Sequence, residues 1–337
     1  MTTPPDTTAD LEALAALRRR CDLSFPYAVR AVVSLGIAEL LRDGPVSTEG
    51  LAATTGTQRR PLVKVLARVA AEGYLARADD RWSLTETGKI LTDAHVRGVL
   101  DNNSGHARLD AGWPGLLHTL RTGQSGYQHV VGQTYWDSVA LDPVLGSTFD
   151  IGLSLWAARW SGALTQLIGA DFDGHIVDVG GGVGRVLADA LAGCPSATGT
   201  LVELPTTVQR AQRLVTEQGL GDRVTYSEQS FFEPLPTGGQ IYLLTQVLHD
   251  WPDDESRQIL HRLAEVVGTG RILIVERIHD GTPGPDEAAF DLMMNVVFAG
   301  GERSLDEYQR LAGAEGLQLV ACTDLIEGVA ALEFRSA

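Results

Sequence analysis

One segment of the chain combines a carboxylate with alternating glycines at the point where a strand is expected to become a helix. Asp178-Val-Gly-Gly-Gly-Val-Gly184 follows the apolar run His175-Ile-Val and precedes Arg185–Ala192, whose apolar spacing predicts a helix. Glycines at these positions let the backbone turn sharply and bring a ligand against the helix N-terminus. A purely structural turn can use the same glycines, so the loop alone does not decide the function.

The chemistry of this loop separates two classes of cofactor. A dinucleotide fingerprint needs G-x-G-x-x-G, and counting from Gly180 its third glycine is replaced by Arg185. The carboxylate of Asp178 repels a pyrophosphate and attracts an ammonium group. The loop therefore favours a ligand such as S-adenosylmethionine over a nicotinamide dinucleotide.

Further polar residues come at the ends of the next two expected strands. Glu203 lies about 20 residues beyond the glycine loop, where an acidic side chain can accept hydrogen bonds from both ribose hydroxyls. Ser230-Phe-Phe232 offers a hydroxyl and an aromatic face to an adenine. Taken singly, Glu203 could be a solvated residue, and either phenylalanine could belong to the core.

A histidine follows the fourth expected strand, in Leu248-His-Asp-Trp251. Two carboxylates could join it: Glu276, which ends the run Ile272-Leu-Ile-Val-Glu, and Glu302, in Gly300-Gly-Glu-Arg303. A histidine flanked by carboxylates is held in one tautomer, and its imidazolium is stabilised after it takes a proton. These residues are candidates for general-base chemistry.

Composition bounds the class of protein. The chain has 337 residues, 44% of them hydrophobic, which suffices for two domains. Its three cysteines suggest neither a disulfide framework nor a zinc site, and the N-terminus lacks the features of a signal peptide. No apolar run approaches the roughly 20 residues that span a bilayer. We therefore expect a cytoplasmic protein without membrane contact.

The first hundred residues predict a helical unit. Helices are expected between 10 and 42, at 45–56 and at 61–73, followed by a hairpin formed by 74–77 and 81–84. This is the outline of a winged helix, which often binds DNA. Its charge is nearly balanced, whereas the whole chain has a net charge of -16, so the acidic excess lies in the rest of the chain. We therefore expect dimerisation rather than nucleic-acid binding.

The later part of the chain alternates between strands and helices after further helical segments up to about 165. Such alternation predicts an α/β, doubly wound parallel sheet. The expected strands are 176–179, 200–204, 224–227, 241–248 and 272–275, with a final hairpin of strands near 317–322 and 329–335 at the sheet edge. Expected helices include 206–218, 254–267 and 304–315, the last begun by a capping box at Ser304. We divide the chain into a dimerisation domain (1–105), a helical connector that contributes to the substrate pocket (106–165) and a Rossmann-like catalytic domain (166–337).

The motifs together resemble one family. The order D-x-G-G-G-x-G, E-L-P, F-F-x-P-L-P, L-H-D-W, V-E-R and G-G-E-R-S is similar to that of the S-adenosylmethionine-dependent O-methyltransferases. That family includes plant caffeate- and isoflavone-type enzymes and bacterial enzymes that methylate aromatic polyketides and antibiotics. The resemblance covers nearly the whole chain, because its members also carry an N-terminal winged-helix dimerisation domain.

The resemblance implies roles for individual residues. It makes His249 the general base, flanked by Glu276 and Glu302. The cofactor-binding residues it implies are Asp178, Gly180, Gly182, Glu203, Ser230 and Phe231. The residues that it places around the acceptor are Asp250, Phe149, Leu153, Met293 and Val297. Three positions depart from the common pattern: Glu203 and Ser230 replace aspartates, and Val297 replaces an asparagine frequent in plant members.

The implied reaction is an in-line methyl transfer to an aromatic hydroxyl by a homodimer, without a metal. An imidazole with a pKa near 6.5 is a weaker base than a phenolate whose acid has a pKa near 10, so the proton transfer is uphill by roughly 5 kcal/mol. Positioning can offset roughly 7–11 kcal/mol.

The acceptor is less well defined by the sequence. Arg18-Arg-Arg20 lies on the first expected helix, and we hypothesise that Arg18 pairs with a carboxylate of the acceptor; a solvated basic face is the structural alternative. Two other functions stay open: a cofactor-binding enzyme of the same fold with different chemistry, and a winged-helix regulator that senses a small ligand.

Overall fold

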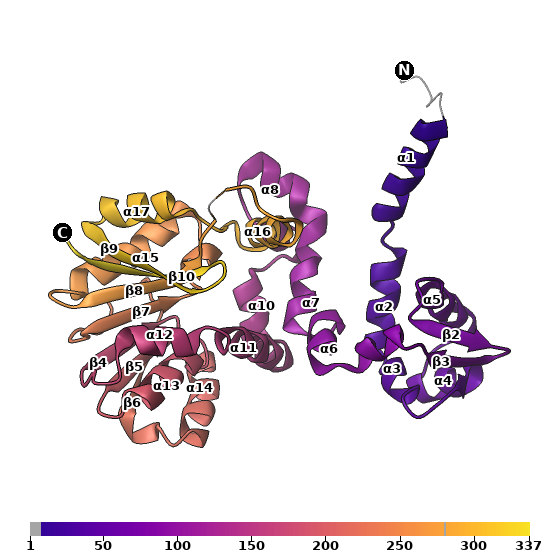
Figure 1. Ribbon diagram of the computed structural model, residues 1–337, viewed down its shortest axis with the longest axis horizontal. Helices are drawn as coiled ribbons and strands as arrows, with labels where there is room; N and C mark the ends of the chain where they lie inside the picture. The colour runs from indigo at the N-terminus through magenta and orange to yellow at the C-terminus, as the bar shows by residue number, and fades with distance from the viewer. Residues whose placement is uncertain (1–7, 280) are drawn as a thin grey trace. The chain divides into compact units, whose positions relative to one another are not determined.

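The computed structural model describes residues 8–279 and 281–337, which divide into two compact units (Figure 1). One unit comprises the described residues up to Ala107 and the other begins at Arg108. The finer three-part division remains a prediction. None of the helices in the described residues has the length and apolarity that a bilayer crossing requires.

The first unit has the elements of a winged helix. They are α1 (Thr8–Arg20), α2 (Ser24–Ser34), α3 (Ile37–Leu40), β1 (Val46–Ser47), α4 (Thr48–Thr55), α5 (Arg59–Ala71), β2 (Leu75–Ala78), β3 (Arg81–Leu84), the 3-10 helix η1 (Thr87–Thr92) and α6 (Ala94–Leu100). The side chain of Ser47 caps α4, and Gly56 ends it at a φ of 66°. The expected hairpin is confirmed: β2 and β3 pair antiparallel, and β1 extends the sheet on the other side of β3.

Short helices precede the sheet in the second unit. They are α7 (Gly105–Leu109), which spans the boundary, η2 (Asp110–Gly115), α8 (Leu116–Thr122), α9 (Gly126–Val131), α10 (Tyr135–Leu141), α11 (Pro143–Ala157) and α12 (Ser161–Ile168). Asp142 caps α11 and Pro143 occupies its first turn, where a missing N–H costs nothing.

The second unit is built on a seven-stranded sheet in the order β6-β5-β4-β7-β8-β10-β9. Its strands are β4 (His175–Val179), β5 (Thr198–Glu203), β6 (Val224–Glu228), β7 (Ile241–Thr245), β8 (Arg271–Arg277), β9 (Leu317–Ile326) and β10 (Val329–Ser336). The remaining elements are α13 (Arg185–Gly193), α14 (Pro205–Glu217), η3 (Gly221–Arg223), η4 (Leu248–Asp250), α15 (Asp253–Val266), α16 (Pro285–Phe298) and α17 (Leu305–Ala314). Strands β4 to β8 pair in parallel, and β10 joins β8 and β9 antiparallel.

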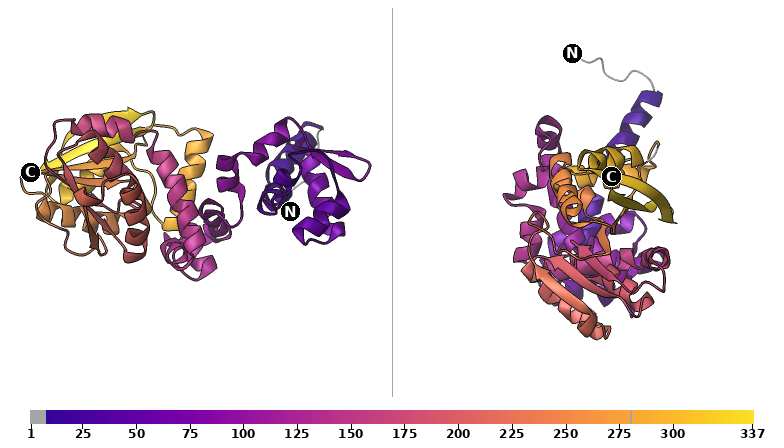
Figure 2. Two further views of the ribbon diagram at one scale, coloured as in Figure 1. Left: turned by 90° about the horizontal axis from the view of Figure 1, so that it is seen from below. Right: turned by 90° about the vertical axis from the view of Figure 1, so that its left-hand side faces the viewer.

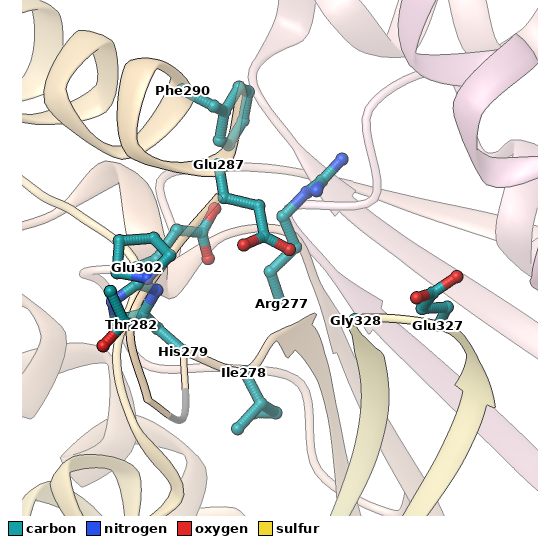
Figure 3. A pocket seen from close by; sticks show the side chains of 10 residues that line it. Arg277, Ile278, His279, Thr282, Glu287, Phe290, Glu302, Glu327 and Gly328 are labelled. Carbon is teal, nitrogen blue, oxygen red and sulfur yellow. The ribbon is translucent and has the colours of Figure 1, made fainter. Parts of the chain in front are cut away.

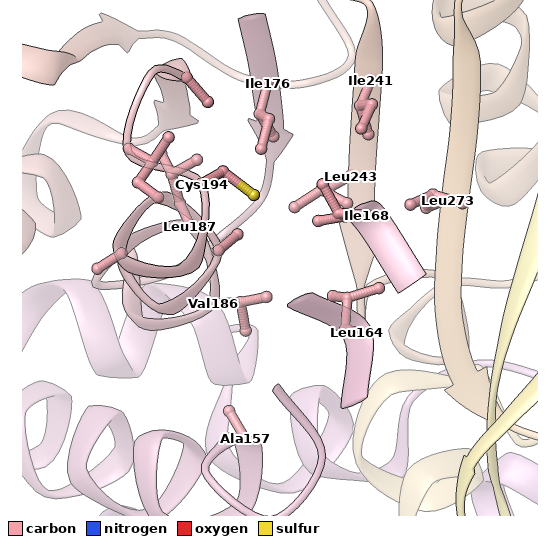
Figure 4. Close-up of a cluster of buried hydrophobic side chains, with 14 of the residues drawn as sticks. Ala157, Leu164, Ile168, Ile176, Val186, Leu187, Cys194, Ile241, Leu243 and Leu273 are labelled. Atoms are coloured by element: carbon pink, nitrogen blue, oxygen red, sulfur yellow. The ribbon is translucent and has the colours of Figure 1, made fainter. Parts of the chain in front are cut away.

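Helices cover both faces of this sheet (Figures 1 and 2). One face packs against α12, α13 and α14, and its buried cluster includes Leu164, Leu187 and Leu243 (Figure 4). The other face packs against α15 and α17 through residues such as Leu260 and Tyr308. Two covered faces explain why β4, β7 and β8 read as continuous apolar runs.

The structure confirms the doubly wound α/β sheet and its terminal antiparallel hairpin, and it shortens one expected strand. The run expected to be a strand over 241–248 stops at Thr245, because Gln246 has a φ of 55° and η4 begins at Leu248. That early stop lifts His249 out of the sheet. Helix α16 was not among the expected elements, and it carries two of the predicted acceptor residues.

Arg223 joins the end of α13 to the start of β5, and its loss should destabilise the second unit. Its guanidinium donates hydrogen bonds to the carbonyl oxygens of Leu191, Cys194, Pro195 and Ala197 at 2.7–3.1 Å. Because hydrogen bonds from a charged donor contribute about 1.5–3 kcal/mol, we expect R223M to lower the free energy of unfolding in urea by about that amount. R213M, at an exposed arginine of α14 without a hydrogen bond to the described residues, is the control and should change it little.

Candidate active site

The predicted site residues gather at the carboxyl edge of the parallel strands. The glycine loop follows β4, Glu203 ends β5, and the histidine segment follows β7 beside the end of β8. Strand β4 lies between β5 and β7, so the chain winds away from it in both directions. Such a switch point leaves a crevice at the strand ends, where open α/β sheets bind their ligands.

The glycine loop turns through left-handed backbone conformations. Gly180, Gly182 and Gly184 have φ values of 68°, 57° and 75°, which side chains with a Cβ adopt at a cost. Gly181 is needed for a different reason, since a Cβ there would lie 2.1 Å from Oδ2 of Asp178. The loop therefore wraps its own aspartate, and Gly184 is the N-cap residue of α13.

Asp178 is completely buried, and neither of its carboxylate oxygens has a hydrogen-bond partner among the described residues. Burial, helped by the nearby charge of Glu203, raises the pKa of Asp178 to about 7. An unpartnered buried carboxylate is costly. A ligand with an ammonium group would offset that cost, because it supplies both positive charge and donors.

The other predicted cofactor residues surround the same loop. Glu203 accepts hydrogen bonds from the backbone N–H of Gly182 at 3.2 Å and of Leu204 at 2.7 Å. Burial raises its pKa to about 7, against the lowering effect of these two donors. The ring of Phe231 lies against Gly180, where a Cβ would be 3.2 Å from it. Ser230 is partly buried, and its hydroxyl accepts from the N–H of Phe232 at 3.3 Å.

His249 lies in the centre of a buried acidic cluster. Its Nδ1 is 3.1 Å from Oε1 of Glu302 and 3.6 Å from Oε2 of Glu276, and its Nε2 is 3.6 Å from Oδ1 of Asp250. The four side chains are between 0% and 11% exposed. The structure thus brings together the three residues that the sequence linked to proton transfer and Asp250, which was expected beside the acceptor.

The acidic surroundings change the basicity of His249. Burial lowers its pKa, but the charges of Glu276 and Asp250 and the hydrogen bond to Glu302 raise it more, to about 10. Burial also raises the pKa of Asp250 and Glu276 to about 7, although the charge of His249 opposes this. The expectation of an ordinary imidazole near 6.5 was therefore wrong: this group is about as basic as a phenolate, and the cluster shares its protons.

Backbone contacts hold this cluster in place. Oε1 of Glu276 accepts from the N–H groups of Val247 and Leu248 at 3.0 and 2.8 Å. The N–H of Gly301 donates to the carbonyl of His249 at 2.8 Å, and a Cβ at Gly300 would lie 2.1 Å from that oxygen. The glycine pair of G-G-E-R-S therefore lets one loop pack directly on the other.

Arg303 locks the same two loops together, a role that the sequence did not suggest. It is 7% exposed, and its guanidinium donates to the carbonyls of Leu248 and Trp251 at 2.8 and 2.7 Å and to Asp253. Its position next to Glu302 in the motif G-G-E-R-S could have indicated a role at the site. Its hydrogen-bond partners, however, are about 50 residues away in the sequence, so the sequence did not identify them.

Helix α16 is tied to the loop that carries Glu302. Oδ1 of Asp291 accepts from the N–H of Glu302 at 2.7 Å, and the amide of Asn295 donates to the carbonyl of Gly300 at 3.1 Å. The same helix carries Met293 and Val297. The wall assigned to the acceptor and the acid beside His249 are thus connected by hydrogen bonds.

The predicted acceptor residues are only partly assembled. Phe149, Met293 and Val297 belong to one apolar cluster, in which the rings of Phe149 and Tyr135 are 5.4 Å apart. Leu153 lies one turn beyond Phe149 on α11, is 40% exposed and lies outside that cluster. Arg18 is exposed on α1 in the first unit. The roles of these residues remain predictions.

The cluster around His249 is also the one group in the described residues with the spacing of a metal site. Ligand atoms of His249, Glu276 and Glu302 all lie within 4.8 Å of one another. Their mutual contacts are equally those of a shared proton, and Oε1 of Glu276 is occupied by two backbone donors. A reaction without a metal remains our prediction.

Comparison with known proteins decides the family. Residues 113–318 match the model of an O-methyltransferase domain, which is more than half of the chain. This chain belongs to the O-methyltransferase family. The O-methyltransferase is an S-adenosylmethionine-dependent enzyme, and the unpartnered Asp178 and the glycine loop fit that cofactor.

Several relatives of this O-methyltransferase come from streptomycetes. The chain is 36% identical to a 2,7-dihydroxy-5-methyl-1-naphthoate 7-O-methyltransferase of Streptomyces carzinostaticus over 90% of this chain and 93% of that protein. It is also 32% identical to an aclacinomycin 10-hydroxylase of Streptomyces purpurascens, over 94% and 86%. A crystal structure of an O-methyltransferase from neocarzinostatin biosynthesis, with S-adenosylmethionine and 2-hydroxy-5-methyl naphthoic acid, has a TM-score of 0.88 at 33% identity and covers 95% of this chain and 98% of that one.

Cofactor affinity of the O-methyltransferase should depend on the ionisation of Asp178. Because burial raises its pKa to about 7, the carboxylate is neutral at lower pH and loses its attraction for a cationic ligand. We expect the affinity for S-adenosylmethionine, measured by calorimetry, to fall by up to about tenfold per pH unit below pH 7. D178N should bind weakly and keep only the smaller pH dependence that comes from Glu203, whose pKa is also about 7. D171N, at an exposed aspartate, should follow the wild type. An affinity that stays constant from pH 5.5 to 8 would contradict this role.

Proposed function

We propose that this chain methylates a phenolic hydroxyl of a small aromatic natural-product intermediate, with His249 as the general base. The observation that carries the proposal is the buried imidazole held by Glu302 and Glu276 at the carboxyl edge of the sheet. The names of relatives support an aromatic acceptor, since one acts on a dihydroxynaphthoate and a neighbouring structure holds a hydroxynaphthoic acid.

The chain's own residues would act in a fixed order. Asp178 and Glu203 bind the cofactor, which supplies an electrophilic methyl group. The apolar cluster of Phe149, Met293 and Val297 excludes water from the acceptor. Nε2 of His249 then takes the proton of the acceptor hydroxyl, while Glu302 at Nδ1 stabilises the resulting imidazolium.

The raised pKa of His249 changes where the cost of this reaction falls. Transfer of a proton from a phenol to a base of similar pKa is nearly balanced, instead of uphill by roughly 5 kcal/mol. At neutral pH, however, the imidazole must first lose its own proton. The free-energy cost therefore lies in deprotonating the imidazolium before the acceptor reacts, and no longer in the proton transfer itself. This cost decreases as the pH rises, because a larger fraction of the enzyme then carries a neutral His249.

Two alternatives are less well supported. The relative named as a hydroxylase shows that proteins of this family include other chemistry, but the complete histidine–glutamate cluster favours a methyl transfer that needs a base. Against a DNA-binding regulator, two basic residues of α5 are already paired: Arg59 with Asp80 at 3.1 Å and Arg68 with Glu72 at 2.6 Å. A mobility-shift assay tests the regulator.

The first test of the function is mass spectrometry of a phenol panel incubated with the enzyme and S-adenosylmethionine. We expect gain of one methyl group, and H249Q should lower kcat by about 10²- to 10⁴-fold. In the wild type, kcat/KM should rise with pH toward about 10, because the unprotonated base is needed.

The carboxylates provide the control for this pH profile. E302Q removes a contact that stabilises the imidazolium, so it should lower the pKa of His249 and start the rise at lower pH. E315Q removes an acid whose ion-pair partners are Arg257 and His261 rather than His249, and it should leave the profile unchanged. Superimposable profiles for E302Q and the wild type would contradict the assignment.

We also propose that the enzyme is a homodimer. Large apolar side chains of the second unit lie in solvent in the isolated chain: Leu141 is 73% exposed, Ile151 60% and Leu155 56%. Ile151 and Leu155 are one turn apart on α11, so they lie on one face of that helix. The expected dimerisation domain also exposes apolar side chains, with Leu23 at 65% and Tyr27 at 64%, so we propose that both units contribute to the dimer contact.

Light scattering should give the mass of a dimer for the wild type. The double variant I151E/L155E places two charges on this face of α11 and should give a monomer. V320E, at a residue of β9 that is 56% exposed, should remain dimeric. A monomeric wild type would reject the proposal.

A further inference from the structure

Arg277 is the feature of the second unit that the proposed reaction does not use. It ends β8, directly after Glu276, and its guanidinium carbon lies 4.4 Å from the ring centroid of Trp156 and 4.9 Å from that of Phe290. Its Nε is buried without a hydrogen-bond partner, and no described carboxylate lies within ion-pair distance of the guanidinium. The two rings thus hold the guanidinium in place, and its N–H groups have no hydrogen-bond acceptor among the described residues.

Arg277 faces the same space as the catalytic cluster. It lines a cavity of about 110 Å³ together with Glu302, Phe290 and Glu287 (Figure 3). The ring of Phe290 is 6.4 Å from that of His249, so one aromatic ring separates the general base from the guanidinium. Arg277 is therefore close enough to contact a molecule whose hydroxyl lies at His249.

The elements around Arg277 are those that carry the predicted acceptor residues. Trp156 follows Leu153 by three residues on α11, and Phe290 precedes Met293 by three on α16, so each pair shares a helix face. The indole N–H of Trp156 donates to Gln246 at 3.2 Å, and the amide of Gln246 donates to Glu276 at 3.4 Å. The stack on Arg277 is thus linked to the carboxylate beside His249.

The geometry selects the type of group that Arg277 can bind. Aromatic rings cover the guanidinium plane, which leaves the N–H groups along its edge. Those groups bind a carboxylate side-on with two parallel hydrogen bonds. The three acids that line the cavity do not form an ion pair with Arg277. Glu302 accepts from His249, and Glu287 accepts from the N–H of Gly284 at 2.8 Å. Glu327 is exposed to water.

We propose that Arg277 binds a carboxylate of the aromatic acceptor and makes this enzyme select hydroxy-aromatic acids. The inference rests on the proposed function, and it assigns the carboxylate to the end of β8 instead of to Arg18 on α1. Arg277 is a specificity-determining residue in this view: it orients the acceptor, and His249 takes the proton.

Binding can test this assignment without turnover. The probe pair is 2,7-dihydroxy-5-methyl-1-naphthoate and the same diol without its carboxylate, titrated by calorimetry into the enzyme saturated with S-adenosylhomocysteine. The wild type should bind the acid about 10- to 100-fold more tightly than the diol, as expected for a hydrogen-bonded charge pair. In R277Q this ratio should fall to near one, and in R277K, which keeps the charge but loses the fork, it should be intermediate.

Matched variants separate this role from packing. Arg159 also stacks on Trp156, at 5.1 Å, but is exposed and does not line the cavity, so R159Q should keep the wild-type ratio. Thermal denaturation shows whether R277Q is folded. If it is not, the ratio of acid to diol affinity in R277K tests the proposal instead. Equal binding of acid and diol by the wild type, or a ratio lost in R18A and kept in R277Q and R277K, would overturn the proposal.

The same samples distinguish this inference from the proposed function. If the acid binds selectively through Arg277 but gains no methyl group from S-adenosylmethionine, the carboxylate site stands and the methylation of this acceptor fails. If both compounds are methylated with equal kcat/KM, the proposed function stands and the role of Arg277 is rejected.

Discussion

The catalytic half of the molecule depends on the mutual neutralisation of buried charge. Transferring His249, Glu276 and Glu302 from water into a protein interior is unfavourable for each group alone. Together they offset much of this cost, because the imidazolium faces the carboxylates and Glu276 also receives two backbone N–H groups. The two loops must therefore hold these side chains within hydrogen-bond distance of one another. The hydrogen bonds from Gly301 and Arg303 to the histidine segment fix the loops in that position.

The cofactor side of the crevice shows the opposite situation. Asp178 is buried without a partner, so the protein alone leaves its charge unsatisfied. The two halves of the site thus differ in a way that suits their tasks. One set of charges is balanced internally to hold a base in position, and the other is left open for a cationic ligand to complete.

Much of this arrangement follows from local patterns in the sequence. Alternating apolar segments identified the five parallel strands, and parallel strands bring their carboxyl ends to one edge, which placed Asp178, Glu203 and His249 there in advance. The basicity of His249 was not predictable, because it depends on distances to acids that lie 27 and 53 positions away in the sequence. Arg303, Gln246 and Arg277 were missed for the same reason: each acts through contacts between segments that no periodicity connects. The end of β7 at Thr245 depends on a left-handed Gln246, and a non-glycine residue gives no sequence signal for that conformation.

The bonds from α16 to the 300–302 loop have a consequence for selectivity. Asp291 and Asn295 anchor the segment that holds Glu302 against His249, and the same helix carries Met293 and Val297. An acceptor that pushes this helix outward also draws Glu302 away from the imidazole, which then loses the contact that orients its ring toward the acceptor hydroxyl. A poorly fitting molecule can then bind in the crevice and still react slowly. The enzyme would thus distinguish acceptors more by their rate of methylation than by their affinity.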